Sequence, residues 1–247
     1  WLTLGALQLE LRQAKDAEAS LQRYLQVAAA QPEQAAAASD DDEEQDSFAE
    51  GGRTQAWLML AQAAELRGDG KAAAGWLDKI DDPQRALEVQ TRRATLLAKQ
   101  GKLKEARALV QQVPERKPED ARAKLIAESQ VLREVKRWPD AHAVLVSAND
   151  RFPSDIDLLY EQAMMAEKIS RMDEMERVLR RVIELKPDHH HAYNALGYSL
   201  AERNQRLPEA RDLIAKAVEL APNDPFIADS LGWVEFRLGN TAQALLH

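Results

Sequence analysis

Three consecutive histidines, His189, His190 and His191, are the side chains of this 247-residue sequence best suited to binding a metal ion. A zinc site needs ligands that converge on one point, which on a helix usually places them one turn apart. Neighbouring residues of a helix instead point about 100° apart, and the chain has no Cys to complete a ligand set. We therefore expect exposed imidazoles at a helix start, no metal site and no cofactor. His142 has no evident partner in the sequence.

Recognisable catalytic motifs are absent from the sequence as well. It contains no glycine-rich phosphate loop, no nucleophile elbow and no HExxH zinc motif. The lack of Cys excludes a thiol nucleophile and a disulfide framework. Acidic side chains are numerous, as expected of a chain with 30% charged residues, but none belongs to a pocket motif. We expect a protein that is not an enzyme.

The charge distribution argues against nucleic acid as a partner. The net charge is −8, whereas a nucleic-acid-binding surface needs clustered Lys and Arg. Residues 1–53 contain 11 acidic and 4 basic residues, while the rest of the chain contains 30 and 29. The acidity therefore belongs to one segment. No run of 18 apolar residues occurs, so we expect no membrane-spanning segment in this sequence.

A repeat of about 34 residues runs through the chain. Its prolines, Pro118, Pro153, Pro187 and Pro222, are spaced 35, 34 and 35 residues apart. Small residues recur with the same period at Gly5, Ala61, Ala94, Ser129, Ala163, Gly197 and Gly232. Twelve or 13 residues after each of them lie Ala17, Ala73, Ala106, Ala141, Met175, Ala210 and Ala244. Closely crossing helices need small side chains at the crossing, so each period predicts two crossing helices.

The pattern Trp1-x2-Leu4-Gly5 followed by Ala17-x3-Leu21 resembles the tetratricopeptide repeat (TPR), whose period is 34. The resemblance implies an all-α, right-handed superhelical solenoid of antiparallel helix-turn-helix units with a concave side. A first unit is expected at 1–29, five units over 54–224, and a shortened unit at 225–247. The five central units are 54–86, 87–120, 122–155, 156–189 and 190–224. Because the sequence begins at Trp1 and stops inside a helical pattern, we interpret it as a fragment of a longer protein.

Residues 30–53 interrupt the period between the first two units. Six acidic residues lie between Asp40 and Asp46, where they repel one another and have no apolar surface to bury. A calcium loop would need acids that alternate with other residues and a Gly at the bend, and this run has neither. Gly51 and Gly52 indicate a flexible return to the repeat. We expect an acidic, flexible insert.

The repeat register also selects candidate protein-binding residues. In a stacked array, the first helix of each unit lines the concave side. In the C-terminal units these predicted groove residues are Tyr160, Met164, Asn194, Tyr198, Phe226, Asp229, Trp233 and Phe236. Aromatic side chains and Met are common in binding grooves. The alternative is that each ring packs within the core. We expect Trp233 to be the most exposed of these residues.

Two stretches carry a closer resemblance. They are AWLMLAQAAELRGDGKAAAGWLDKI and NALGYSLAERNQRLPEARDLIAKAVELAPNDPFIADSLGWVEFRLGNTAQAL. Both are similar to proteobacterial TPR lipoproteins, some of which act at the outer membrane as scaffolds for a carboxyl-terminal processing protease and its cell-wall hydrolase substrates. This resemblance implies a periplasmic adaptor, anchored to the outer membrane through a lipidated Cys upstream of Trp1.

We therefore expect a non-catalytic scaffold that binds a protein or peptide in its concave groove. Two alternatives remain: a cytoplasmic assembly or chaperone adaptor, and an auxiliary domain of an enzyme whose catalytic part lies outside this sequence. TPR domains that clamp the carboxylate of chaperones carry Lys and Asn at the groove positions, with further Lys and Arg, and that set is missing here. In the full-length sequence, a signal peptide ending before a Cys would favour the periplasmic adaptor. An appended catalytic domain would favour the auxiliary role.

Overall fold

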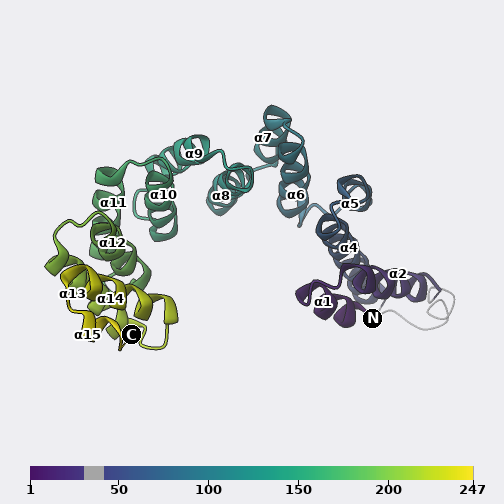
Figure 1. Ribbon diagram of the computed structural model, residues 1–247. Coiled ribbons are helices and arrows are strands. Elements are labelled where there is room, and N and C mark those ends of the chain that lie inside the picture. The colour runs from purple at the N-terminus through teal and green to yellow at the C-terminus, as the bar shows by residue number, and fades with distance from the viewer. Residues whose placement is uncertain (31–41, 247) are drawn as a thin grey trace. The chain divides into compact units, whose positions relative to one another are not determined.

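Helices are the regular elements of the described residues, 1–30 and 42–246, in this computed structural model; side chains are described for all of these except 42–50 (Figure 1). The chain divides into two compact units, Trp1–Arg116 and Lys117–His247. The first holds α1 (Leu2–Glu10), α2 (Ala14–Ala30), α4 (Asp42–Leu66), α5 (Gly70–Leu77), α6 (Ala86–Lys99) and α7 (Leu103–Gln111). The second holds α8 (Pro118–Glu134), α9 (Trp138–Arg151), α10 (Ile156–Lys168), α11 (Met172–Leu185), α12 (His190–Glu202), α13 (Leu207–Leu220), α14 (Pro225–Leu238) and α15 (Thr241–Ala244). The predicted all-α fold of helix-turn-helix pairs is confirmed. No helix among the described residues combines the length and apolarity needed to cross a bilayer.

The crossing of the two helices in each pair depends on the small residues that define the period. Ala61, Ala94 and Ala163 are completely buried. At Gly197 the two backbones approach so closely that an added Cβ would lie 2.7 Å from Ile214 Cγ1 and 2.8 Å from the carbonyl oxygen of Ala210. The periodic small residues therefore mark the points where the helices touch.

Each helix pair turns through a residue in the left-handed backbone region. These residues are Arg12, Gly68, Gly101, Lys136, Ser170, Asn204 and Gly239, with φ between 56° and 86°. The turns share the Schellman hydrogen-bond pattern, in which the N–H of Gly101 bonds Ala98 O and the next N–H bonds Leu97 O. Because four of the seven turns lack Gly, the turn geometry does not stand out in the sequence.

Part of the predicted flexible insert is helical. α4 begins at Asp42, so residues 42–53 continue into the first helix of the second pair and do not form a loop. The remaining insert residues, 31–41, lie outside the described residues. Gly52 of α4 packs against Tyr24 of α2, where an added Cβ would lie 2.1 Å from the phenol oxygen. The expectation of a flexible return at Gly51 and Gly52 is therefore wrong, because both residues lie within α4 and Gly52 packs closely against Tyr24.

Ion pairs join successive helix pairs in the second unit. Asp155, the N-cap of α10, accepts hydrogen bonds from the Leu158 N–H (3.0 Å) and from Nη2 of Arg122 on α8 (3.1 Å). The Arg122 guanidinium also lies 2.8 Å from the Asp157 carboxylate. The hydrogen bond from Arg122 lowers the pKa of Asp155 against the opposing effect of burial. The folded state therefore favours the charged carboxylate.

His142 has a partner, which the sequence analysis missed. Its Nε2 lies 2.9 Å from Oε1 of Glu174 on α11. The same oxygen accepts a hydrogen bond from Gln162 Nε2 at 2.7 Å, and Gln162 Oε1 accepts one from Asn149 Nδ2 at 2.7 Å. Buried polar groups need such partners. His142 thus belongs to a polar chain that links α9, α10 and α11.

The close crossing at Gly197 predicts an unusual response to alanine. Gly197→Ala should destabilise the second unit by about 1–3 kcal/mol, because its Cβ would push α12 and α13 apart. Gly75→Ala is the matched control: Gly75 lies inside α5 with nothing within 4 Å of an added Cβ, so alanine should stabilise by up to about 1 kcal/mol. Urea unfolding followed by circular dichroism measures both changes. Two changes of the same sign would contradict a packing role for Gly197.

The Arg122–Asp155 pair predicts a pH-dependent contribution to stability. A carboxylate with a lowered pKa stabilises the folded state above its unfolded pKa of about 3.9, and this contribution is lost as pH falls through the lower folded value. Arg122→Gln should therefore lower the free energy of unfolding at pH 7, and the difference from the unmodified protein should shrink below about pH 4. Lys216→Gln, which removes an exposed i,i+3 pair with Glu219, should change little at either pH. A difference that is constant with pH would contradict the role given to Asp155.

Candidate protein-binding site

A pocket of about 300 Å³ lies in the second unit, between α12 and α14. It is lined by Tyr198 and Glu202 of α12, by Asp229, Gly232, Trp233 and Phe236 of α14, and by Ala244 of α15. Four of the eight predicted groove residues therefore line one pocket: Tyr198, Asp229, Trp233 and Phe236.

Capping residues define the two ends of α14. Asp224 is the N-cap, and its Oδ1 accepts hydrogen bonds from two backbone N–H groups of the first turn at 2.9 and 3.2 Å. Pro225 follows at the first helical position, where the missing N–H has no cost. Gly239 ends the helix with φ at 86°. Between these ends, the spacing of four and three residues places Asp229, Trp233 and Phe236 on one face.

Trp233 lines the pocket, but much of its ring is buried. Its indole stacks on Phe236 with ring centroids 5.7 Å apart, and the Arg237 guanidinium lies 5.4 Å from its ring centroid. The ring is half-buried against the hydrophobic cluster formed by α10 to α14. The prediction that Trp233 is the most exposed groove residue is therefore wrong. Phe236 is 55% exposed and Tyr198 is 38% exposed, so these two rings supply the accessible aromatic surface.

Carboxylates surround the phenol of Tyr198. Its pKa is raised, first by burial and then by the charges of Glu202, Asp229 and Glu167. The interaction of the phenol with the Glu202 carboxylate adds to this rise of the pKa. Arg237 supplies one opposing charge, and its Nη1 donates to the Glu202 carbonyl oxygen at 3.3 Å. The pocket thus combines aromatic rings with a negative potential, which favours a cationic group in a ligand.

The other four predicted groove residues do not line this pocket. Tyr160 and Met164 of α10 are half-buried and pack against the same hydrophobic cluster as Trp233. Asn194 of α12 is half-buried, and its buried Oδ1 has no hydrogen-bond partner among the described residues. Phe226 is 81% exposed at the start of α14, where it lines a shallow hollow together with residues 221–225. The eight predicted groove residues therefore divide into four that line the pocket, three that are half-buried and the exposed Phe226.

Two residues important to the pocket were missed by the sequence analysis. Glu202 lies one helical turn beyond Tyr198, so extending the same helical face by four residues would have found it. Arg237 lies one helical turn beyond Trp233 on α14, so the same four-residue spacing would have placed its guanidinium near the Trp233 ring. Its hydrogen bond to the Glu202 carbonyl oxygen instead depends on the contact between α12 and α14. No local pattern in the sequence signals that contact.

The three histidines have different surroundings. His189 is the N-cap of α12: its Nδ1 accepts a hydrogen bond from the Ala192 N–H at 3.1 Å, and its ring centroid lies 5.1 Å from that of Tyr160. Burial is the main cause of the lowered pKa of His189. His190 and His191 begin α12 with ring centroids 4.1 Å apart. Their rings do not diverge here as the helical geometry predicted.

Family models of the tetratricopeptide repeat match residues 156–189 and 175–225. Residues 156–225 contain tetratricopeptide repeats. TPR proteins generally mediate protein–protein interactions. The matched residues 175–225 include Tyr198 and Glu202, which form one wall of the pocket. The repeat predicted from the period is therefore confirmed in this part of the chain.

Known proteins resemble the chain in sequence and in fold. It is similar to the TPR repeat-containing protein PA4667 of Pseudomonas aeruginosa, with 35% identity over 185 residues. That match covers 75% of this chain, and the chain spans 31% of the relative's length. A solved tetratricopeptide repeat protein from Parabacteroides merdae has a TM-score of 0.54 and 15% identity, covering 78% of this chain and 77% of its own. A structure of MamA AMB-1 has a TM-score of 0.50 and 19% identity. The match covers 64% of this chain and 92% of the MamA chain. These structures show the TPR fold.

The different burial of Trp233 and Phe236 predicts different effects on stability. Trp233→Ala should lower the free energy of unfolding by about 2 kcal/mol, because half of a large ring loses its packing. Phe236→Ala should stay within about 0.5 kcal/mol of the unmodified protein. Trp233→Phe should be nearly neutral, since the buried indole N–H has no acceptor among the described residues. Chemical unfolding of the three variants tests this order, and equal losses from Trp233→Ala and Phe236→Ala would contradict it.

Proposed function

We propose that the chain is a non-catalytic interaction scaffold that binds a peptide segment of a partner protein in the pocket between α12 and α14. The observation that carries this proposal is the combination of two accessible rings, Tyr198 and Phe236, with two carboxylates, Glu202 and Asp229, in one pocket. Exposed aromatic residues beside a half-buried one are typical of the residues that dominate binding energy in interfaces.

The charge of the pocket defines the chemistry of the peptide. A Lys or Arg side chain can lie over an aromatic face and pair with the carboxylates at the same time. Arg237 already shows the first of these contacts within the chain, since its guanidinium lies over Trp233. The preferred ligand is therefore a segment with a basic residue next to an aromatic or aliphatic one. A segment rich in Asp and Glu would be repelled.

The resemblance to outer-membrane TPR lipoproteins supports a more specific proposal. The full-length protein acts in the periplasm, anchored to the outer membrane by a lipid, and recruits a carboxyl-terminal processing protease or its cell-wall hydrolase substrates. The similarity to a TPR repeat-containing protein of Pseudomonas aeruginosa is in keeping with a bacterial source. Fractionation of cells that express the full-length protein addresses the compartment, and soluble protein in the cytoplasm would contradict it.

A displayed peptide library selected against the chain tests the pocket. Enriched peptides should contain Lys or Arg within two residues of an aromatic or aliphatic side chain. Phe236→Ala should weaken a selected peptide by roughly 30-fold, which corresponds to a loss of about 2 kcal/mol at 1.4 kcal/mol per tenfold change. Asp229→Asn should also weaken binding and reduce its sensitivity to salt.

Lys216→Ala provides the control, because Lys216 is an exposed residue of α13 that does not line the pocket. Its peptide affinity should equal that of the unmodified chain. Enrichment of acidic peptides, or affinities unchanged in both Phe236→Ala and Asp229→Asn, would overturn the assignment of the pocket.

A further inference from the structure

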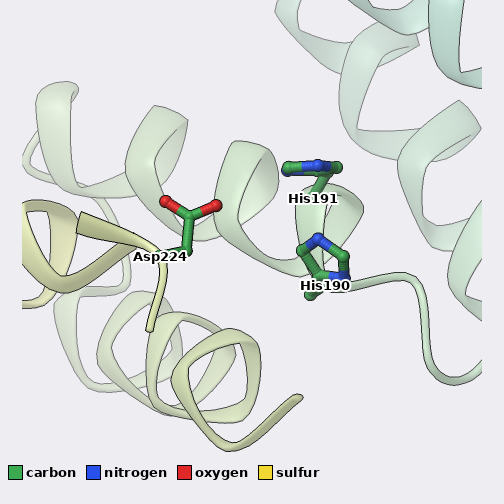
Figure 2. Close-up of side chains that lie close together, drawn as sticks. All are labelled: His190, His191 and Asp224. Carbon is green, nitrogen blue, oxygen red and sulfur yellow. The ribbon is translucent and has the colours of Figure 1, made fainter. Parts of the chain in front are cut away.

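A second constellation of side chains lies at the ends of α12 and α14 and takes no part in the pocket. His190 and His191 occupy the first two positions of α12, and Asp224 is the N-cap of α14. One ligand atom from each lies within 4.8 Å of those from the other two. Figure 2 shows the three side chains converging on one space between the start of α12 and the segment that leads into α14.

The repeat register relates this constellation to the ion pair described above. When the crossing residues Ser129 and Gly197 are aligned, Arg122 of α8 corresponds to His190 of α12. Asp155 corresponds to Asp224 in the same way, since each is the N-cap of the next pair's first helix. Between α8 and α10, the Arg122 guanidinium of α8 bonds two carboxylates of the next pair, those of the cap Asp155 and of Asp157. Between α12 and α14, two imidazoles occupy that place.

The ligand atoms of these residues are available. Among the described residues, neither the His190 nor the His191 imidazole forms a hydrogen bond or an ion pair. Asp224 uses Oδ1 for its two capping bonds, which leaves Oδ2 for another partner. His190 and Asp224 are half-buried, while His191 is exposed. The site is therefore open to solvent, and its side chains have room to rotate.

We propose that His190, His191 and Asp224 bind a divalent transition-metal ion, with zinc as the best match, and that water completes the coordination. Two imidazoles and one carboxylate are ligands that zinc accepts at about 2.0–2.2 Å. Ligand atoms of a tetrahedral zinc site are about 3.4 Å apart at such bond lengths, so small side-chain rotations suffice from the present separation. Mg²⁺ and Ca²⁺ prefer all-oxygen sites and are disfavoured.

The bound ion would act as the guanidinium does between α8 and α10. It would link the first turn of α12 to the N-cap of α14 and so stabilise the contact between these two successive repeats. Metal that binds the folded chain and not the unfolded chain raises the midpoint of thermal unfolding. The expectation from sequence that no metal site exists considered the three histidines alone. The third ligand is 33 residues farther along the chain than His191.

Titration calorimetry with zinc chloride at neutral pH, on the chain without a polyhistidine tag, tests the proposal. One ion should bind per chain, and the thermal midpoint should rise with zinc concentration. His191→Ala and Asp224→Asn should each weaken binding at least tenfold. Asp224→Asn is informative because Asn also caps helices well, so the fold is retained. Cobalt(II) provides a second readout, because four-coordinate cobalt absorbs strongly in the visible range and should lose that absorbance in both variants.

His189→Asn is the matched control. His189 uses its Nδ1 as the cap of α12, and Asn can replace it in that role while removing an imidazole. Zinc affinity should be unchanged in this variant. The proposal is overturned if the unmodified chain shows no saturable zinc binding, if His191→Ala and Asp224→Asn bind as well as it does, or if His189→Asn weakens binding to the same extent.

Discussion

The close crossing of two helices within each pair is the constraint on which the other features depend. At Gly197 the helices approach until even a methyl group would contact the opposite backbone. This approach fixes the rotation of α12 about its own axis, because one residue must face α13. Once that residue is fixed, the 3.6-residue period determines where the others point. Tyr198 and Glu202 then face α14, while His190 and His191 lie at the helix end beside Asp224.

A second consequence of the crossing is that equivalent positions meet at two junctions of the second unit, α8 with α10 and α12 with α14, while their chemistry differs. The position of Arg122 carries a guanidinium that pairs with Asp155, and the same position in α12 carries His190, which faces Asp224. The first helices α10, α12 and α14 each begin with a side-chain cap, Asp155, His189 and Asp224, which satisfies free backbone N–H groups of the first turn. A carboxylate cap next to the preceding repeat therefore provides a site for a cation, and the residue opposite determines which cation is suitable.

The sequence predicted the features that depend on the period and missed those that depend on contacts between repeats. The all-α class and the recurring small residues follow from local spacing, and so does the face shared by Asp229, Trp233 and Phe236. The burial of Trp233 does not, because it depends on how α14 packs against the cluster around it. The partner of His142 is 32 residues away on another helix pair, where no local pattern indicates it. The helical state of residues 42–53 was missed because charge and glycine content describe the isolated segment, whereas Gly52 lies in a helix and packs against Tyr24.

The pocket illustrates how a repeat scaffold can gain a specific site without departing from its own packing rules. Tyr198 and Trp233 occupy equivalent positions of α12 and α14, and Asp229 corresponds to Asn194. Residues at these positions do not form the helix crossing, so their identity can differ between repeats while the crossing is kept. The exposed Phe236 ring stacks on the half-buried Trp233 ring, which itself packs on the core. The accessible Phe236 ring is therefore held in place by the partly buried Trp233 ring. A ligand would meet a largely preorganised pocket, and this lowers the entropic cost of binding.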